Sequence, residues 1–455
     1  MTTHPANISY QPTEGLTYNP NDSKYFDESM LQKEITRTFE ICHGCRMCFK
    51  YCDSFPKLFK FIDENHDGDV RKITITETTE VMDDCFQCKL CEVQCPYTPR
   101  DGHEYQLDFP KLVHRFQAVR RKKHFGQKSL KKSLKKRLRD FLLKQPDFLG
   151  KLSRLSLGTM NVMNRVSFHR QMMQIFSGIH KNKLLPNFAS QTFDKWAKKN
   201  KKVLKKDSPV PETILFQTCY VQNNEPQIGK DVLSVMEKNN VACGCVEGFK
   251  CCGMPAWEQG DLATLRANAK HNIQKLLPLV EQGAKVLAVN PTCAMMMKKE
   301  YAELVAPEDK AAAQKVAENV YDPSEYLWKL KDSDRLNLNF KSSPGEKVSY
   351  HAPCHLRAQA VGFKGRDLIK KIPGVSVGFV AECCGHDGTY AMKEESFEKS
   401  LRIGQKAFDG MQGQAAEIWA TDCPLAAVQF KQKTGIKPMH PMSILAKAYE
   451  ENGFS

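Results

Sequence analysis

Residues 213–220 read TILFQTCY, residues 251–253 read Cys-Cys-Gly, and residues 285–293 read KVLAVNPTC. A strand-like run ending in cysteine, an adjacent cysteine pair and a second strand-like run ending in cysteine thus follow one another. The same order returns later in the chain as KVSYHAPCHL (347–356), Cys-Cys-Gly (383–385) and EIWATDC (417–423). This internal repeat predicts two structural units of one kind.

Helix-like stretches separate the cysteines of each copy. Residues 261–283, DLATLRANAKHNIQKLLPLVEQG, place apolar residues at i, i+3 and i+4. Strands alternating with helices predict two α/β lobes with largely parallel sheets, residues 207–335 and 336–455. Because ligands bind at the carboxyl ends of strands in such sheets, the strand-end cysteines are candidate ligands.

Upstream of the repeat, eight cysteines form two C-x-x-C-x-x-C-x-x-x-C runs, Cys42–Cys52 and Cys85–Cys95. Three cysteines at intervals of three allow one loop to give three thiolates to a [4Fe–4S] cluster, and the fourth binds the other cluster in two-cluster ferredoxins. The runs therefore predict two [4Fe–4S] clusters, one held by Cys42, Cys45, Cys48 and Cys95 and the other by Cys85, Cys88, Cys91 and Cys52. A structural zinc site would need cysteines in pairs, which neither run provides. Pro96 follows the second run, whereas Asp53 follows the first, which we expect to change only the local turn.

The composition is that of a soluble globular protein, with 455 residues, 41% hydrophobic and 26% charged. No stretch approaches the roughly 20 apolar residues of a membrane-spanning helix, and the N-terminus lacks the pattern of a secretory signal. We therefore expect a cytoplasmic protein whose 18 cysteines are thiolates in a reducing compartment and not disulfides.

Charge is distributed very unevenly along the chain. Residues 111–206 contain 27 Lys and Arg and three Asp, a net charge of +24, while the whole chain carries +15 and the remainder therefore −9. This contrast predicts a local contact with an anionic partner. We expect five segments: an N-terminal arm (1–30), a two-cluster ferredoxin-type domain (31–110), a basic amphipathic helical segment (111–206) and the two lobes.

A two-cluster ferredoxin module followed by a paired strand-Cys, Cys-Cys-Gly, strand-Cys pattern resembles the iron–sulfur oxidoreductases with cysteine-rich (CCG) domain pairs. These include the catalytic subunit of heterodisulfide reductase, the C subunit of anaerobic glycerol-3-phosphate dehydrogenase, and the iron–sulfur subunits of glycolate and lactate oxidation. The phrases NPTCAMMMKKEY (290–301), HAPCHLR (351–357) and TDCPLA (421–426) lie where those families place ligands. The order of segments is most similar to the glycerol-3-phosphate dehydrogenase subunit.

The resemblance implies one or two further iron–sulfur clusters in the lobes. In heterodisulfide reductase each CCG motif ends in C-x-x-C and gives five cysteines to a non-cubane cluster, but here Met296 and Ala426 replace the fifth cysteine. Four thiolates suffice for a cubane. The alternative is that one or both lobes hold only structural thiols. The implied ligands are Cys219, Cys251, Cys252 and Cys293 in the first lobe, and Cys354, Cys383, Cys384 and Cys423 in the second.

Other residues near these motifs are weaker candidates for iron ligands than the sixteen cysteines. Cys243 and Cys245 have no counterpart in the second copy and are interpreted as strand or loop thiols. Asp387 is interpreted as a turn residue. Four histidines could ligate iron or deliver protons, but hydrogen-bonded loop histidines are the simpler interpretation: His351, His355, His386 and His440. We identify no catalytic residue.

The basic segment contains a candidate amphipathic helix. One face carries Leu130, Leu134, Leu138, Phe141 and Leu142, and most of the remainder is Lys and Arg. A cationic amphipathic helix fits an anionic lipid surface. A second apolar stretch could deepen that contact or line a groove: Leu155, Met160, Met163, Met172, Met173, Ile175 and Phe176. A solvated linker is the alternative, and nucleic-acid binding is disfavoured because no finger, helix-turn-helix or aromatic platform accompanies the charge.

No flavin or nicotinamide fingerprint is found, so the chain would need a partner to oxidise an organic substrate. The first hypothesis is an electron-transfer subunit on the cytoplasmic face of the inner membrane, between a separate flavoprotein dehydrogenase and a quinone. A catalytic disulfide reductase and a redox adaptor for a peroxide-reducing partner are the alternatives. The sequence decides neither substrate, direction of electron flow nor oligomeric state.

Overall fold

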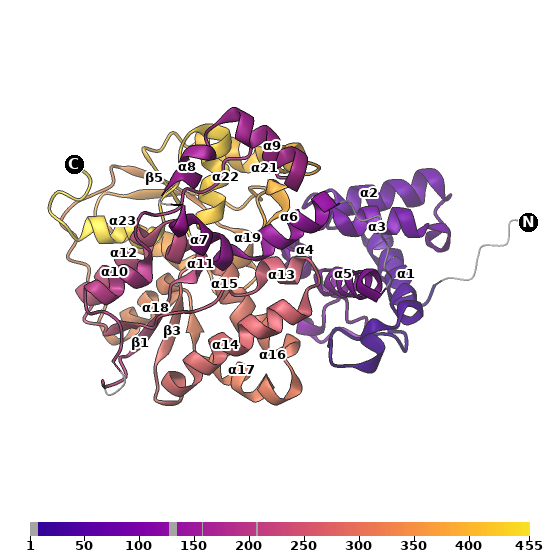
Figure 1. Cartoon of the computed structure of the whole chain (residues 1–455), viewed down its shortest axis with the longest axis horizontal. Coiled ribbons are helices and arrows are strands. Elements are labelled where there is room, and N and C mark those ends of the chain that lie inside the picture. The colour runs from indigo at the N-terminus through magenta and orange to yellow at the C-terminus, as the bar shows by residue number, and fades with distance from the viewer. Residues whose placement is uncertain (1–7, 127–133, 157, 206–207) are drawn as a thin grey trace, which may run out of the picture. The chain divides into compact units, whose positions relative to one another are not determined.

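The computed structural model describes residues 8–126, 134–156, 158–205 and 208–455. It divides into two units. Unit 1 contains residues 1–130 and 257–262, and unit 2 contains residues 131–256 and 263–455 (Figure 1). The predicted fold class is confirmed, because unit 1 is a helical cysteine-rich module and unit 2 holds two α/β lobes with parallel sheets.

Unit 1 is built from helices around an apolar core. α1 begins where the Asp27 side chain accepts a hydrogen bond from Met30 N, and Leu31, Ile35 and Phe39 form its buried face. α3 begins with a capping box between Thr74 and Glu77. Its elements are η1 (Ser23–Phe26), α1 (Glu28–Cys45), α2 (Ser54–Lys60), η2 (Phe61–Asn65), η3 (Val70–Lys72), α3 (Ile75–Asp83), α4 (Leu90–Gln94), η4 (Pro99–Asp101) and α5 (Phe109–Gly126). α5 crosses the predicted boundary between residues 110 and 111.

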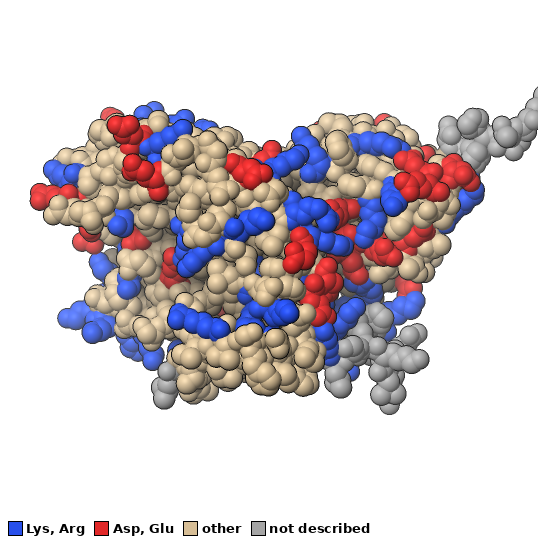
Figure 2. Space-filling view, turned by 90° about the horizontal axis from the view of Figure 1, so that it is seen from above, with Lys and Arg blue, Asp and Glu red and all other residues tan. Residues whose placement is uncertain are grey.

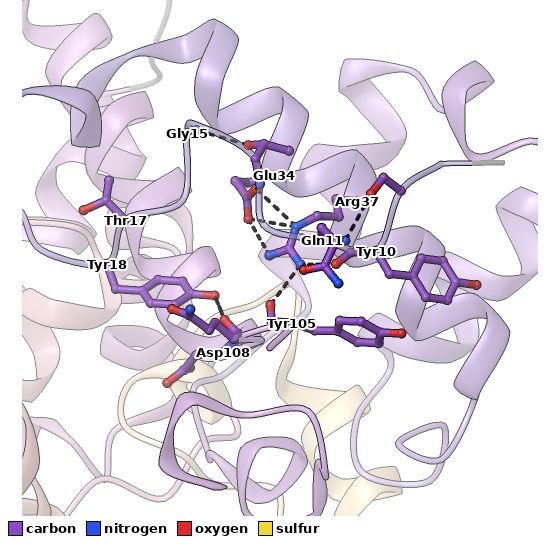
Figure 3. Close-up of polar contacts among 12 residues, drawn as sticks. Tyr10, Gln11, Gly15, Thr17, Tyr18, Glu34, Arg37, Tyr105 and Asp108 are labelled. Atoms are coloured by element: carbon purple, nitrogen blue, oxygen red, sulfur yellow. Dashed lines mark hydrogen bonds and ion pairs between the residues drawn. The ribbon is translucent and has the colours of Figure 1, made fainter. Parts of the chain in front are cut away.

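The described part of the predicted N-terminal arm, from residue 8, packs onto unit 1. Arg37 of α1 is buried in an ion pair with Glu34 at 2.6 Å and donates to the carbonyl oxygens of Tyr10 and Tyr105 at 2.9 Å (Figure 3). On α5, the buried Arg115 donates to the carbonyl oxygens of Gly15 and Tyr25. Two buried guanidinium groups thus fix the arm to the helices.

Residues 257–262 also belong to unit 1. The ring of Trp257, which is 1% exposed, stacks on His114 at 5.2 Å, and Lys89 Nζ lies 5.4 Å from its centre. Arg121 forms an ion pair with Asp261 at 3.0 Å.

The first lobe of unit 2 (residues 208–335) contains a four-stranded parallel sheet in the order β2-β1-β3-β4. Its strands are β1 (Thr213–Phe216), β2 (Cys243–Cys245), β3 (Lys285–Ala288) and β4 (Val320–Tyr321). β1 and β3 are the predicted strands, β2 lies where Cys243 and Cys245 were interpreted as strand or loop thiols, and β4 was not predicted. Its helices are α11 (Thr218–Asn223), α12 (Pro226–Lys238), α13 (Met254–Glu258), α14 (Leu262–Glu281), α15 (Pro291–Met295), η5 (Met296–Glu300), α16 (Tyr301–Leu304), η6 (Pro307–Asp309), α17 (Lys310–Ala317), α18 (Pro323–Lys329) and η7 (Leu330–Ser333).

The second lobe (residues 336–455) repeats the arrangement with a three-stranded parallel sheet in the order β6-β5-β7. Its strands are β5 (Lys347–His351), β6 (Ser376–Val380) and β7 (Ile418–Thr421). Its helices are α19 (Cys354–Arg357), α20 (Lys364–Ile369), η8 (Tyr390–Met392), α21 (Phe397–Gln412), α22 (Pro424–Thr434) and α23 (Pro441–Ala448).

The two lobes share one apolar core. Leu215 and Leu287 of the first sheet belong to the same buried cluster as Val348 and Ala420 of the second. α12 and α23 lie side by side in this core (Figure 1). The core therefore fixes the orientation of one lobe on the other.

The basic segment between residues 134 and 205 packs onto both lobes. Arg154 donates to Asn223 Oδ1 of the first lobe at 3.0 Å, and Arg139 pairs with Glu395 of the second at 2.8 Å. It forms α6 (Leu134–Lys144), α7 (Pro146–Leu155), α8 (Thr159–Met163), α9 (Ser167–Ser177) and α10 (Phe193–Lys199). Leu130, part of the predicted apolar face, lies outside the described residues. Within the described ranges, no helix combines the length and apolar character needed to cross a membrane.

Candidate iron–sulfur sites

The eight cysteines of unit 1 surround two cavities. Cys42, Cys45, Cys48 and Cys95 line one, together with Phe55, Phe59 and Leu107. Cys52, Cys85, Cys88 and Cys91 line the other. Each cavity thus takes three cysteines from one run and the fourth from the other run. That these thiolates bind iron stays a prediction.

The local backbone explains how each run can turn around a cavity. Arg46, Gln87 and Lys89, which lie between the cysteines, have φ angles of 54°, 64° and 60°. Residues in this left-handed region reverse the chain within a few residues and allow successive cysteines to face one centre. Asp53, which replaces the usual proline, is the residue before α2, so the helix begins directly after Cys52.

Several of the buried thiols in these cavities resist ionisation without a metal. Burial raises the pKa of Cys42 and of Cys91 well above the ordinary value, and the neighbouring cysteines raise both further. Burial likewise raises the pKa of Cys48 to about 12. A metal that binds thiolates would supply the positive charge that favours deprotonation.

In the first lobe, four cysteines converge at the carboxyl ends of three adjacent parallel strands. Cys219 follows the central β1, Cys251 and Cys252 follow the loop after β2, and Cys293 follows β3. Their thiols form a chain of contacts, because Cys219 hydrogen-bonds Cys251, Cys251 hydrogen-bonds Cys252, and Cys252 hydrogen-bonds Cys293. The charge of Cys293 also acts on Cys219, so the four thiols form one group.

Buried polar groups hold this first-lobe site in place. Tyr301 Oη donates to Cys252 O at 2.9 Å, and Asp147 Oδ2 accepts from Cys251 N at 2.9 Å. Burial, and then the proximity of Cys251, raise the pKa of Asp147 to about 6. Asp147 lies on α7, 104 residues before Cys251, and no local motif in the sequence indicates it.

The second lobe has the same layout but different chemistry. Cys354 follows the central β5, Cys383 and Cys384 follow β6, and Cys423 follows β7. All four line one cavity, which also contains three histidines, Asp387 and Ala426. Burial raises the pKa of Cys423 to about 12.

Asp387 is more than the turn residue that the sequence suggested. Its Oδ1 accepts from Cys354 Sγ at 3.1 Å, and its Oδ2 lies 3.8 Å from Cys383 Sγ. Ligand atoms of Cys354, His355 and Asp387 all lie within 4.8 Å of one another. The carboxylate therefore faces the thiols of the candidate site.

The histidines near the motifs differ in their contacts. His351 hydrogen-bonds Thr421 and Glu382 O, His440 donates to Val289 O at 3.2 Å, and burial lowers the pKa of each to about 4. His355 Nδ1 lies 2.8 Å from Thr292 Oγ1 of the first lobe. His386 is 2% exposed, and among the described residues neither of its ring nitrogens has a hydrogen-bond partner.

Cys243 and Cys245 lie apart from these groups on β2, as strand thiols. Cys245 packs into the apolar core of unit 2, and burial raises the pKa of Cys243 to about 12.

Comparison with known proteins agrees with this division. The sequence model of the cysteine-rich domain matches residues 213–298 and 348–431, and that of the 4Fe-4S dicluster domain matches residues 41–98. These matches contain all sixteen predicted ligands.

The chain is also similar to characterised proteins. It is 27% identical to the C subunit of anaerobic glycerol-3-phosphate dehydrogenase of Escherichia coli (strain K12) over 68% of this chain and 77% of that protein. It is 26% identical to lactate utilization protein A 2 of Bacillus cereus (strain Q1) over 41% of this chain and 76% of that protein. The chain is an iron–sulfur protein that joins a 4Fe-4S dicluster domain to two cysteine-rich domains.

Proposed function

We propose that this chain is the iron–sulfur electron-transfer subunit of a membrane-associated oxidoreductase on the cytoplasmic face of the inner membrane. It relays electrons between a separate flavoprotein dehydrogenase and a quinone. The observation that carries the proposal is the grouping of sixteen cysteines into four sets of four, each sufficient for one four-iron cluster. A dehydrogenase subunit among the similar proteins supports the partnership with a flavoprotein.

A direct contact between the lobes supports electron transfer from one to the other. Thr292, which precedes Cys293 in the first lobe, hydrogen-bonds His355, which follows Cys354 in the second, at 2.8 Å. Gln359 Nε2 also donates to Pro291 O at 3.0 Å. The chain segments that carry one ligand of each lobe are therefore in hydrogen-bond contact.

An exposed apolar surface supports attachment to a membrane. Of the eighteen exposed large hydrophobic side chains among the described residues, eleven lie between residues 138 and 176. Leu155 is 81% exposed and Phe168 is 71% exposed. Figure 2 views the side on which α8 and α9 lie, where Lys and Arg are spread over the surface together with groups of Asp and Glu. Apolar side chains among cations fit a bilayer with anionic headgroups.

The apolar surface includes two residues of the predicted apolar face of α6. Its side chains are Leu138, Phe141, Phe148, Leu152, Leu155, Val162, Met163, Val166, Phe168, Ile175 and Phe176. On α6, Leu138 and Phe141 point outward, while Arg139 and Leu143 are buried. The ion pair of Arg139 with Glu395 attaches the helix to the second lobe and leaves Leu138 and Phe141 exposed.

Iron and sulfide analysis of anaerobically purified protein, with electron paramagnetic resonance (EPR), tests the relay. We expect about 16 iron atoms per chain, with signals beyond a coupled ferredoxin pair. About 12 would place a cluster in one lobe only and would still support transfer through it. About 8 would leave both lobes empty and contradict the relay as proposed.

Sedimentation with vesicles containing anionic lipid tests the membrane part. The double variant Val162→Asp/Phe168→Asp should reduce binding at least tenfold, because carboxylates replace two exposed apolar side chains. Leu338→Asp is the matched control, since Leu338 is 51% exposed and lies between η7 and β5, outside residues 138–176. Equal binding by wild type and the double variant would contradict attachment through this surface.

Oxidation of the reduced protein by a quinone in the same vesicles tests the acceptor. Electron transfer from the reduced protein to the quinone should be slower in the double variant than in wild type, and the control variant should react at the wild-type rate. Met296 and Ala426 replace the fifth cysteine of each motif, which counts against the alternative that the chain is a disulfide reductase. If the protein reduced a disulfide substrate faster than it reduced the quinone, that alternative would be favoured.

A further inference from the structure

The two lobes have the same fold but differ in the groups that surround their cysteines. At the positions that follow Cys-Cys-Gly, the first lobe has Met254 and Pro255, whereas the second has His386 and Asp387. The first-lobe thiols contact one another, while in the second lobe Cys354 and Cys383 both face the carboxylate of Asp387. The second site therefore contains an oxygen donor among its thiols.

We propose that Asp387 is a ligand of the second-lobe iron–sulfur cluster and gives it one oxygen ligand beside the four thiolates. Ala426 stands where the fifth cysteine of a C-x-x-C would be, and it lines the same cavity as Asp387. The carboxylate thus restores a fifth donor that the cysteine pattern lacks. In the first lobe the fifth position is Met296, which is fully buried.

The surroundings of Asp387 suit a bound anionic group. Asp387 has a φ angle of 26°, a conformation that aspartate and asparagine tolerate better than most residues. The preceding residue, His386, is buried in the same cavity with two ring nitrogens that lack partners among the described residues. Buried polar groups without partners in the protein indicate a missing group at the site.

A buried lysine and a fixed histidine lie close to the cysteines of this cavity. Lys183 is 2% exposed, lies beside Cys384 and donates to Gln429 Oε1 at 2.5 Å. Burial lowers the pKa of Lys183 to about 7 and the charge of Cys384 opposes that shift, so anionic groups at this site favour its ammonium form. His355 is held by Thr292, with a ring nitrogen within 4.8 Å of the Asp387 carboxylate.

The inference rests on the proposed function in one respect, since the second lobe must hold a cluster. In full-length, anaerobically prepared protein, Cys384→Ser identifies that cluster by the iron and the EPR signal that it removes. Asp387→Asn, which suits the same backbone conformation, should change the g-values and the midpoint potential of that signal and of no other. Asp147→Asn, beside the first lobe, is the matched control and should leave that signal unchanged.

Asp387→Cys distinguishes a ligand from a neighbouring charge. If Asp387 binds iron, this variant should keep the wild-type iron content, and the Mössbauer spectrum of ⁵⁷Fe-labelled protein should lose a component of about one iron with an oxygen-type isomer shift. Circular dichroism confirms that each variant is folded. If the Mössbauer spectrum of Asp387→Cys and the EPR signal of Asp387→Asn were both unchanged, Asp387 would not be a ligand, while the proposed relay would still stand. If Cys384→Ser removed neither iron nor signal, the proposed relay itself would fail.

Discussion

Each Cys-Cys-Gly places a glycine where another residue would disturb the chain. Gly253 and Gly385 have φ angles of 91° and 73°, in the region that favours glycine. At Gly385 a Cβ atom would lie 1.9 Å from Ser400 O, a backbone atom of α21. The loop that carries Cys383 and Cys384 can therefore approach α21 only because this residue has no side chain.

Gly385→Ala should destabilise the second lobe by more than the roughly 1 kcal/mol of an unfavourable φ angle, because the backbone must also move away from Ser400. We expect lower thermal stability and loss of the iron that Cys384→Ser removes. Gly435→Ala is the control, since Gly435 has a φ angle of 79° but no atom of the described residues within 4 Å of where its Cβ would lie. Similar losses in the two variants would show that contact with α21 is unimportant.

At the scale of elements, α1 connects the N-terminal arm to the first cysteine run. It carries Glu34 and Arg37 at its centre and Cys42 and Cys45 at its end. The Arg37 guanidinium donates hydrogen bonds to the Glu34 carboxylate and to two backbone carbonyl oxygens, those of Tyr10 and Tyr105, which lie far apart in the sequence (Figure 3). This one side chain fixes the helix, the arm and the loop after the second run.

Arg37→Met should destabilise α1 by about 3–5 kcal/mol, because it leaves the buried Glu34 carboxylate without its partner. Hydrogen exchange followed by mass spectrometry should show at least about a hundredfold faster exchange in α1 peptides. Arg71→Met removes the more exposed ion pair with Asp69 and should cost less than about 1 kcal/mol. Comparable acceleration by the two substitutions would contradict this account.

At the scale of the whole molecule, the two lobes of unit 2 depend on each other through their common core and polar contacts between them. His440 caps α23 of the second lobe, accepts from Met442 N and donates to Val289 O of the first lobe. The hydrogen bond from Met442 N requires an unprotonated Nδ1, so the two contacts together require the neutral imidazole, with the proton on Nε2 as assigned from these partners.

This contact predicts a loss of stability in acid. Burial lowers the pKa of His440 to about 4, against about 6.5 in an unfolded chain. Between these values the unfolded chain binds more protons, so the free energy of unfolding falls as pH decreases, by about 3 kcal/mol for the full shift. The contribution is complete above about pH 6.5 and is lost as the pH falls through the folded pKa.

His440→Asn keeps a helix-capping side chain but does not titrate in this range. Urea unfolding of wild type and variant at pH 7.5, 6 and 5 should show a difference in stability that narrows as the pH falls. Taking the difference cancels the release of iron in acid, which affects both proteins. A difference that stays constant with pH would contradict the role assigned to His440.

Much of the local chemistry followed from the sequence. The repeat predicted two parallel α/β lobes, and the spacing of cysteines predicted how the two runs of unit 1 would be shared between two sites. For β2 the sequence left strand and loop open, because three residues, two of them cysteines, give too little periodic signal. Asp387 was interpreted as a turn residue because its contact with Cys354, 33 residues away, is not visible in any local pattern.

The sequence by itself determined which residue types recur and at what intervals, because the strand period and the cluster loop are local properties of the chain. Only the tertiary structure decided which distant groups meet: Asp147 with Cys251, Thr292 with His355, and Asp387 with Cys354. It also decided that α6 turns Leu138 and Phe141 outward, since the ion pair of Arg139 with Glu395 sets the orientation of that helix. Such contacts depend on the packing of whole elements, and packing is a property of the folded molecule.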